Sequence, residues 1–133
     1  IGDGGVRLID FGSGGNEFPA GIAVDADRNV YVCGAVDVGG VWRYAAAALD
    51  TGGSLRSSFG NGGTLVLDVP TLDAFAYAAL LEPSGGLFLA GASNQSLARD
   101  AGEAPLGNGP NVSVAKLRVD RAGVVLVSGF DTP

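Results

Sequence analysis

The chain has 133 residues, of which 23 are glycine, 8 are basic and 14 are acidic, and its formal net charge is −6. This length is enough for one compact domain with a hydrophobic core and short for two ordinary ones. Neither membrane insertion nor nucleic-acid binding is expected, because no apolar run reaches the roughly 18 to 20 residues of a membrane-spanning helix and the single lysine, Lys116, leaves no cluster of positive charge.

The first half of the chain predicts a series of short β-strands. Its apolar runs are rich in Val, Ile, Leu, Tyr and Phe, and clusters of Gly, Asp, Asn and Pro separate them, which is the pattern of strands and turns. The alanine run at 45–48 would favour a helix by itself, but its counterpart at 115–118 alternates apolar and polar residues, so we interpret it as a strand. The strands expected here cover residues 6–10, 21–25, 30–33 and 42–49.

The second half follows the same pattern, with its own four short apolar runs. A turn at 25–29 in the first half has its equivalent at 82–86, where Asn or Gly can accept a positive φ and close a hairpin. The strands expected in this half cover residues 64–68, 77–81, 87–90 and 112–119.

The two halves are copies of one unit. The motif Gly-Asp-Gly-Gly at residues 2–5 returns as Gly-Asn-Gly-Gly 58 positions later, and residues 21–34 return 57 positions later. The turn at 50–53 returns 70 positions later, so the second unit carries about 13 additional residues, in an inserted loop at about 92–111. Stacked repeats have periods of this order, and each unit needs a neighbour to bury its apolar face. We expect the two units to span residues 1–59 and 60–133.

Two stretches of the first unit resemble known bacterial repeats. Residues 20–34 are similar to the blade motif of β-propeller repeats of the SBBP and NHL kind, and residues 44–63 resemble the delta-60 repeat of secreted and surface bacterial proteins. The resemblance implies an all-β fold of two propeller-blade-like, four-stranded antiparallel repeats, incomplete as a closed propeller on its own. It also implies an extracellular or cell-surface location, or a periplasmic one. The second unit departs from the pattern at 121–127, and its last residues lack a Gly-x-Gly-Gly motif.

The sequence offers little catalytic chemistry. It contains no histidine, which excludes His-based triads, His-ligated zinc and His acid–base catalysis. A Ser-Lys dyad could use only Lys116, which has no serine motif beside it, and the Gly-x-Gly-Gly motifs lack the helix and the Gly-Lys ending of a phosphate loop. We therefore do not expect an enzyme, and we assign no catalytic, cofactor-binding or metal-binding residue.

Some acidic residues leave a weaker possibility of metal binding. Asp25, Asp27 and Asn29 have the alternating oxygen spacing of a calcium loop, but the later bidentate glutamate is missing. We favour an ordinary Asx-rich hairpin turn, with a loop calcium as the alternative and no other cofactor. The acidic pairs Asp68 with Asp73 and Asp100 with Glu103 have no cleft assigned to them, so glycosidase-type catalysis is not expected.

Trp42 and Cys33 each allow a structural and a functional interpretation. Trp42 is the single tryptophan and opens an expected strand, so it is interpreted as a packing residue, with stacking on a sugar ring as the alternative. Cys33 corresponds to Ala90 in the second unit, which indicates a small buried position rather than a reactive thiol.

Two stacked blade-like units would expose an apolar face at each end and leave unpaired strand edges. Identical copies could cover these faces by forming a ring or a filament, or the remainder of a larger chain could do so. We expect a non-catalytic structural or interaction module whose partners are its own copies or the rest of a larger propeller. The alternative is a carbohydrate- or calcium-binding module that uses Trp42 and the inserted loop, with a glycan as ligand.

Overall fold

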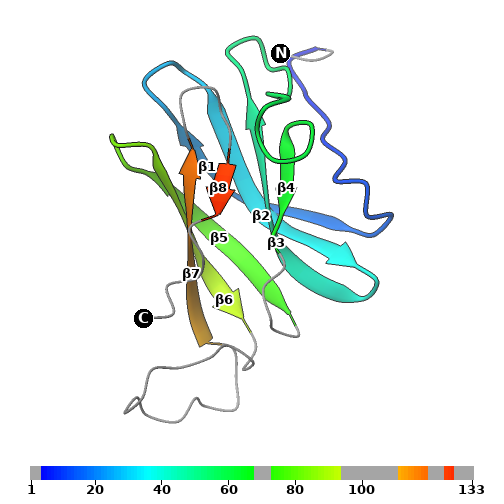
Figure 1. Ribbon diagram of the computed structural model, residues 1–133. Coiled ribbons are helices and arrows are strands. Elements are labelled where there is room, and N and C mark those ends of the chain that lie inside the picture. Colours follow the sequence, from blue (N-terminus) through cyan, green and yellow to red (C-terminus); the bar gives the residue numbers. More distant parts are fainter. Residues whose placement is uncertain (1–3, 68–72, 94–110, 120–124, 128–133) are drawn as a thin grey trace, which may run out of the picture.

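The computed structural model describes residues 4–67, 73–93, 111–119 and 125–127, which form two antiparallel sheets packed face to face (Figure 1). Within these residues there is no helix, and hence none that could cross a membrane. The all-β class predicted from the sequence is confirmed.

Each sheet has four strands, and strands that follow one another in the chain are neighbours in the sheet. Each strand expected from the sequence is found, with somewhat different ends, except the one at residues 6–10. The strands of sheet 1 are β1 (Glu17–Val24), β2 (Val30–Val38), β3 (Val41–Leu49) and β4 (Thr64–Val66). Those of sheet 2 are β5 (Ala74–Leu81), β6 (Gly86–Ser93), β7 (Asn111–Val119) and β8 (Val125–Val127).

The prediction of a strand at residues 6–10 is wrong, because apart from a bridge at Val6 these residues are irregular. Their equivalent 58 positions later is β4, which pairs with β3. A strand needs a neighbouring edge, and no strand in the described part of the chain offers residues 6–10 the edge that β3 offers β4. Because β4 lies beyond residue 59, sheet 1 takes its fourth strand from the segment expected to open the second unit.

Strand β8 is not among the expected strands. Its pair Val119↔Val125 lies 70 positions after the bridge Leu49↔Leu55, so β8 is equivalent to the start of the β3–β4 connection. It is therefore not the equivalent of β4, although both strands lie fourth in their sheets.

The two sheets share a backbone irregularity at positions 57 residues apart. The register of β1 against β2 shifts between Pro19 and Gly21, and that of β5 against β6 shifts between Ala76 and Ala78, at equivalent positions. Opposite each shift stands a glycine, Gly34 or Gly91, where a Cβ atom would overlap a backbone carbonyl oxygen of the neighbouring strand. Both sheets thus require glycine at the same point, because two backbones approach closely at a β-bulge.

The hydrophobic core lies between the sheets, where β5 packs across β1, β2 and β3. Sheet 1 contributes alternate residues of β2 and β3, and sheet 2 contributes alternate residues of all three of its longer strands, as expected for strands with one buried face. The core residues from sheet 1 are Tyr31, Cys33, Tyr44, Ala46 and Ala48, and those from sheet 2 include Leu87, Leu89, Ala115, Leu117 and Val119.

The connection from β3 to β4 closes one end of this core. Asp50 Oδ1 accepts hydrogen bonds from the N–H groups of Gly52 and Ser54, which fixes the first turn. Phe59 is fully buried, and its ring lies edge-on to Tyr31 with centroids 5.8 Å apart. The resemblance to the delta-60 repeat rests on this segment, and the residues described here form its turn and close the core.

Candidate functional site

Each sheet has an inner face, which meets the other sheet, and an outer face, which does not. On the outer face of sheet 1, Ile22 lies beside Val32 and Val24 lies beside Val30, because these residues are paired across β1 and β2. Ile22 is 65% exposed and Val24 is also exposed, so the outer face of sheet 1 presents aliphatic side chains to the surroundings.

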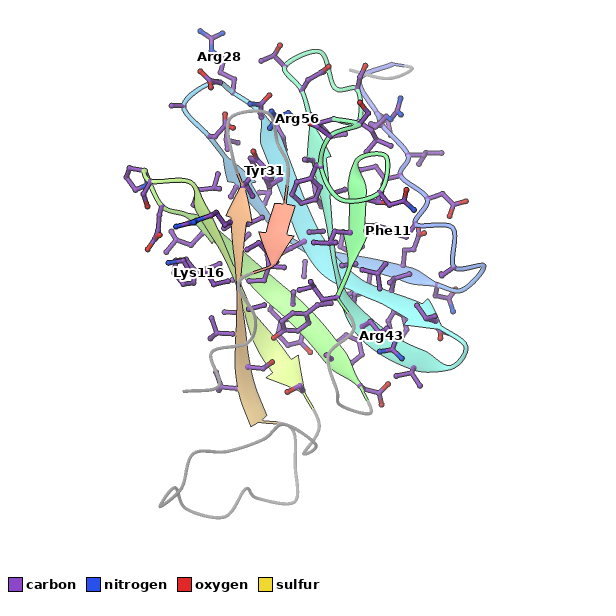
Figure 2. All side chains as sticks on the ribbon, in the orientation of Figure 1. Phe11, Arg28, Tyr31, Arg43, Arg56 and Lys116 are labelled. Carbon is purple, nitrogen blue, oxygen red and sulfur yellow. The ribbon has the colours of Figure 1, made fainter. Side chains whose placement is uncertain are left out.

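A cleft of about 430 Å³ lies on this outer face, between the sheet and the N-terminal segment at residues 7–11. Figure 2 shows Phe11 of that segment beside sheet 1, and the backbone N–H of Phe11 donates a hydrogen bond to Glu17 Oε1 at 2.7 Å. Only two charged side chains, Arg7 and Glu17, are found among the residues that line the cleft. The strand residues lining it include Ile22, Val30, Val32, Ala45, Ala47 and Leu49.

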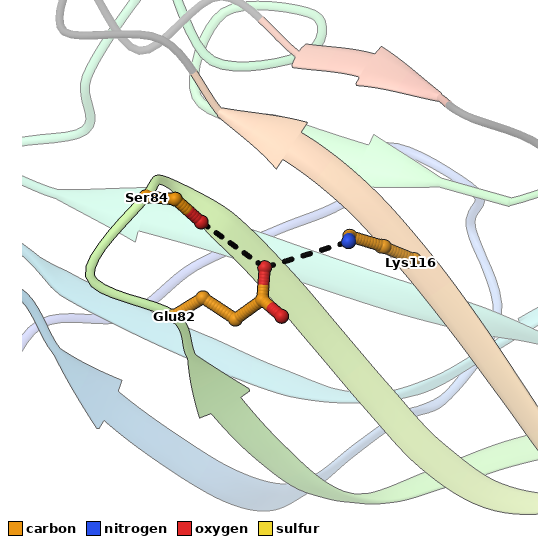
Figure 3. A network of polar contacts seen from close by, with 3 residues as sticks. All are labelled: Glu82, Ser84 and Lys116. Atoms are coloured by element: carbon orange, nitrogen blue, oxygen red, sulfur yellow. Dashed lines mark hydrogen bonds and ion pairs between the residues drawn. The ribbon is translucent and has the colours of Figure 1, made fainter.

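The outer face of sheet 2 is apolar with a basic margin. Leu80, Phe88 and Lys116 lie side by side across β5, β6 and β7, and Leu80 is 66% exposed. The ammonium group of Lys116 lies 3.4 Å from Glu82 Oε2 and 4.9 Å from the centre of the Phe88 ring. Ser84 donates a hydrogen bond to the same Glu82 oxygen (Figure 3). The Lys116 ammonium group is thereby held over the Phe88 ring, and the aliphatic side chain of Leu80 remains exposed beside it.

The repeat relates the two outer faces to the two inner ones. We call two residues counterparts when they are 57 positions apart in β1 and β5 or in β2 and β6, or 70 positions apart in β3 and β7. Ile22 and Val32 on the outer face of sheet 1 have the counterparts Ala79 and Leu89, which face the core. Conversely, core residue Tyr31 has the counterpart Phe88 on the outer face of sheet 2.

The two sheets therefore stack in the same orientation. The face of the repeat unit that is buried in sheet 1 is exposed in sheet 2, and the face that is exposed in sheet 1 is buried in sheet 2. If they packed like against like, the counterparts of core residues would also lie in the core. Instead, the outer face of sheet 1 is equivalent to the buried face of sheet 2, and the outer face of sheet 2 is equivalent to the buried face of sheet 1. Each exposed face is thus equivalent to one that is already buried inside the molecule. The exceptions are Lys116 and Arg118 on the outer face of sheet 2, which stand where sheet 1 has the core residues Ala46 and Ala48.

A second, polar groove of about 980 Å³ lies between the equivalent turns at 25–29 and 82–85. Asp25 Oδ1 accepts the backbone N–H of Asn29, and Oδ2 accepts the Asn29 side-chain amide, both at 2.9 Å. The hydroxyl of Tyr31 donates to the same Oδ2 at 3.3 Å. Burial on its own would raise the pKa of the Asp25 carboxyl, but these hydrogen bonds hold that pKa below its ordinary value.

Tyr31 links this turn to the core. Arg56 donates a hydrogen bond to the Tyr31 hydroxyl at 3.0 Å, and Figure 2 shows the two side chains together at one end of the sheets. Burial raises the pKa of Tyr31, with the charge of Arg56 acting in the opposite direction. The polar groove therefore consists largely of groups that already hydrogen-bond one another.

The turn at 25–29 is also the place where the sequence left a calcium loop as an alternative. Asp25 closes a hairpin turn with Asn29, in the manner of an Asx-rich turn. In the described ranges no three Cys, Asp or Glu side chains gather in a way that could hold a metal ion. Asp68, Asp100 and Glu103 lie outside the described residues.

Trp42 belongs to a row of aromatic side chains. Its ring lies 5.2 Å from that of Phe75, which in turn stacks on Tyr77 at 6.2 Å with the ring planes 5° apart. The Trp42 backbone N–H donates to Asp73 Oδ1 at 2.9 Å. Trp42 is half-buried by this packing, whereas Tyr77 is 52% exposed. Most of the inserted loop, residues 94–110, lies outside the described residues.

Cys33 lies in the core, which confirms the buried position predicted for it, and burial raises the pKa of its thiol. Its counterpart Ala90 lies on the outer face of sheet 2, beside Val114. The sequence predicted two outer apolar faces but did not identify their residues. The residues of each outer face can be identified from the alternation of side chains along a strand and the repeat offsets, once the register of each strand pair is known.

Comparisons of the chain with protein-family models, with curated proteins and with solved structures found no match.

Proposed function

We propose that this chain is a non-catalytic structural and interaction module of a secreted or cell-surface bacterial protein. Its two sheets act as propeller-blade-like repeats, and its outer faces bind sheets of the same kind. Those sheets come either from further copies, arranged in a ring or a filament, or from the rest of a larger propeller. The blade-like character and the location rest on the resemblance of residues 20–34 and 44–63 to bacterial repeats.

The observation that carries this proposal is the stacking of the two sheets in the same sense. Ile22 on one outer face and Leu80 on the other are each about two-thirds exposed, although their neighbours across the strands are apolar. Exposed apolar area of this extent is typical of interaction surfaces. The equivalence of each outer face to a buried one supports the complementary face of a like sheet as its partner.

The side chains on the two outer faces support binding rather than catalysis. They are aliphatic and aromatic for the most part, and among the charged groups on the outer face of sheet 2, Lys116 forms an ion pair with Glu82. Among the described residues, neither face brings together a nucleophile and a base.

A tandem fusion tests the proposal for both sources of the partner sheet. Two copies joined by a flexible Gly/Ser linker face each other at an effective concentration of about millimolar. We expect the fused protein to unfold in urea as one cooperative unit at a higher midpoint than the single chain, because one pair of outer faces becomes buried. A fused protein whose halves unfold at the midpoint of the single chain would contradict the proposal. A fusion carrying Thr51→Glu, a change in an exposed turn, is the control.

A carbohydrate-binding module is the second candidate, and the aromatic row of Trp42, Phe75 and Tyr77 favours it. A half-exposed tyrosine at the end of a rigid stack can present its ring to a sugar face. The test is a glycan array with the unmodified chain and with Tyr77→Ala. Phe18→Ala is the matched control, since Phe18 is 50% exposed and Tyr77 is 52% exposed. Binding that is lost in Tyr77→Ala alone would support this candidate, and an array without binding would reject it.

A further inference from the structure

We propose that the partner is a second copy of this chain and that copies join head to tail. The outer face of sheet 2 in one copy packs against the outer face of sheet 1 in the next. This inference rests on the proposed function and adds to it the identity of the partner, the faces used and their order.

The interface already present inside the molecule is the pattern for the new one. Within the chain, Tyr31 and Tyr44 project from sheet 1 toward sheet 2, where they meet the buried residues of β6 and β7. At the interface between copies their counterparts Phe88 and Val114 take the same places, and both lie on the outer face of sheet 2. The arrangement continues an interface that the chain already forms, with the equivalent strands β1 to β3 and β5 to β7 in the same order.

The receiving face has the required residues, and a cleft lies between them and the N-terminal segment at residues 7–11, which already covers part of the face. Val32, Ala45, Ala47 and Leu49 line the cleft of about 430 Å³ on the outer face of sheet 1. Their counterparts are Leu89, Ala115, Leu117 and Val119, all of which are buried against sheet 1 in the internal interface. The cleft is therefore the position at which an aromatic side chain such as Phe88 from a second copy enters.

Charges at one end of the two faces are complementary. Arg118 is exposed on the outer face of sheet 2 and is paired with Gly86, next to the turn at 82–85. Within the chain, that turn borders the same groove as the turn at 25–29. When the stacking continues, the turn at 25–29 of a second copy occupies the corresponding position. It brings the carboxylates of Asp25 and Asp27 to the end of the interface where Arg118 lies.

Head-to-tail joining has a consequence for size. Each copy uses two different faces, so a pair that does not close on itself still has one free face of each kind and can add further copies. The assembly ends as a ring if the rotation closes and grows as a filament if it does not. A pair that forms through two identical faces would instead stop at two chains.

Two single-face variants test the order of the faces. Ile22→Glu blocks the outer face of sheet 1, and Leu80→Glu blocks that of sheet 2, at sites with nearly equal exposure of 65% and 66%. Each variant alone should be a single chain by light scattering, with association about tenfold weaker or more, since a buried apolar contact is replaced by a charge. A mixture of the two variants should form pairs, because each supplies the face that the other lacks.

The other outcomes are equally informative. If either variant alone forms pairs as readily as the unmodified chain, like faces join, and the head-to-tail order is wrong although the outer faces still bind like sheets. If the unmodified chain stays single at every concentration, the second copy is not the partner, and the tandem fusion decides the proposed function separately. Val24→Glu and Val114→Glu repeat the test at other exposed positions of the same two faces, and circular dichroism confirms that each variant is folded.

Discussion

The hydroxyl of Tyr44 in β3 donates a hydrogen bond to the backbone carbonyl oxygen of Ser113 in β7 at 2.9 Å, across the interior between the two sheets. The two residues are 69 positions apart, and both are buried. The Ser113 side-chain hydroxyl is also hydrogen-bonded to the Tyr44 oxygen. This is a polar contact between the sheets in an otherwise largely apolar core, so it restricts how they can slide past each other.

Tyr44→Phe should destabilise the fold by about 1 kcal/mol, because a buried hydrogen bond is lost while the ring and its packing are kept. The measurement is the urea midpoint of the variant against that of the unmodified chain. Tyr77→Phe is the control, since it removes a hydroxyl from a half-exposed side chain. Equal changes in the urea midpoint for the two substitutions would mean that the hydrogen bond between Tyr44 and Ser113 adds no stability of its own.

Gly34→Ala and Gly91→Ala should each destabilise the protein by about 2 kcal/mol or more, because the new methyl group would overlap the carbonyl oxygen of Phe18 or Phe75. Gly52→Ala is the control, in an exposed turn where the nearest atom is a side-chain oxygen of Asp50, 3.3 Å from the added Cβ. Thermal unfolding of the three variants checks the prediction. An alanine at residue 34 or 91 that is tolerated as well as one at residue 52 would show that the bulges do not constrain the sheets.

Arg28 and Gly85 occupy the same place in the two equivalent turns, with φ angles of 65° and 98°. Arg28→Gly should leave stability within about 0.5 kcal/mol, because relief of the left-handed strain is offset by the greater freedom of glycine in the unfolded chain. Gly85→Ala should cost about 1 to 2 kcal/mol, since its Cβ would lie 2.8 Å from the Val119 carbonyl oxygen. Urea unfolding of both variants tests this asymmetry, and a larger loss in Arg28→Gly would refute it.

The lowered pKa of Asp25 makes a prediction about acid stability. A carboxyl whose pKa is lower in the folded state than its ordinary value of 3.8 stabilises the fold at every pH above 3.8. This stabilisation is lost as the pH falls through the pKa of the folded state. Asp25→Asn should therefore lower stability at neutral pH and flatten its decline in acid. Asp27→Asn, in the same turn, is the control for loss of a charge. Parallel pH profiles for Asp25→Asn and the unmodified chain would be inconsistent with this assignment.

Local patterns predicted most strands, because the turns are defined by residues close in sequence. The turns at 25–29 and 82–86, for example, need only an acidic residue, an Asn or Gly and two flanking apolar runs. The strand at 6–10 failed for the opposite reason. Its composition matches that of β4, but a strand forms only where a neighbouring edge exists, and residue patterns do not encode the presence of that edge.

The candidate site was predictable only in outline. The repeat implied two outer apolar faces, but the assignment of Ile22 to one and Leu80 to the other depends on strand register, and a shift by one residue would exchange inner and outer side chains. The bulges at residues 19–21 and 76–78 shift that register within a strand. The sense of stacking between the sheets depends on contacts between residues far apart in the chain, such as Tyr44 and Ser113.

The central claim is that the two outer faces are halves of one interface, and the molar mass of the unmodified chain tests it most directly. Light scattering over a wide range of protein concentrations should show the mass rising with concentration above that of one chain. A mass that stays at one chain up to millimolar concentration would contradict the claim.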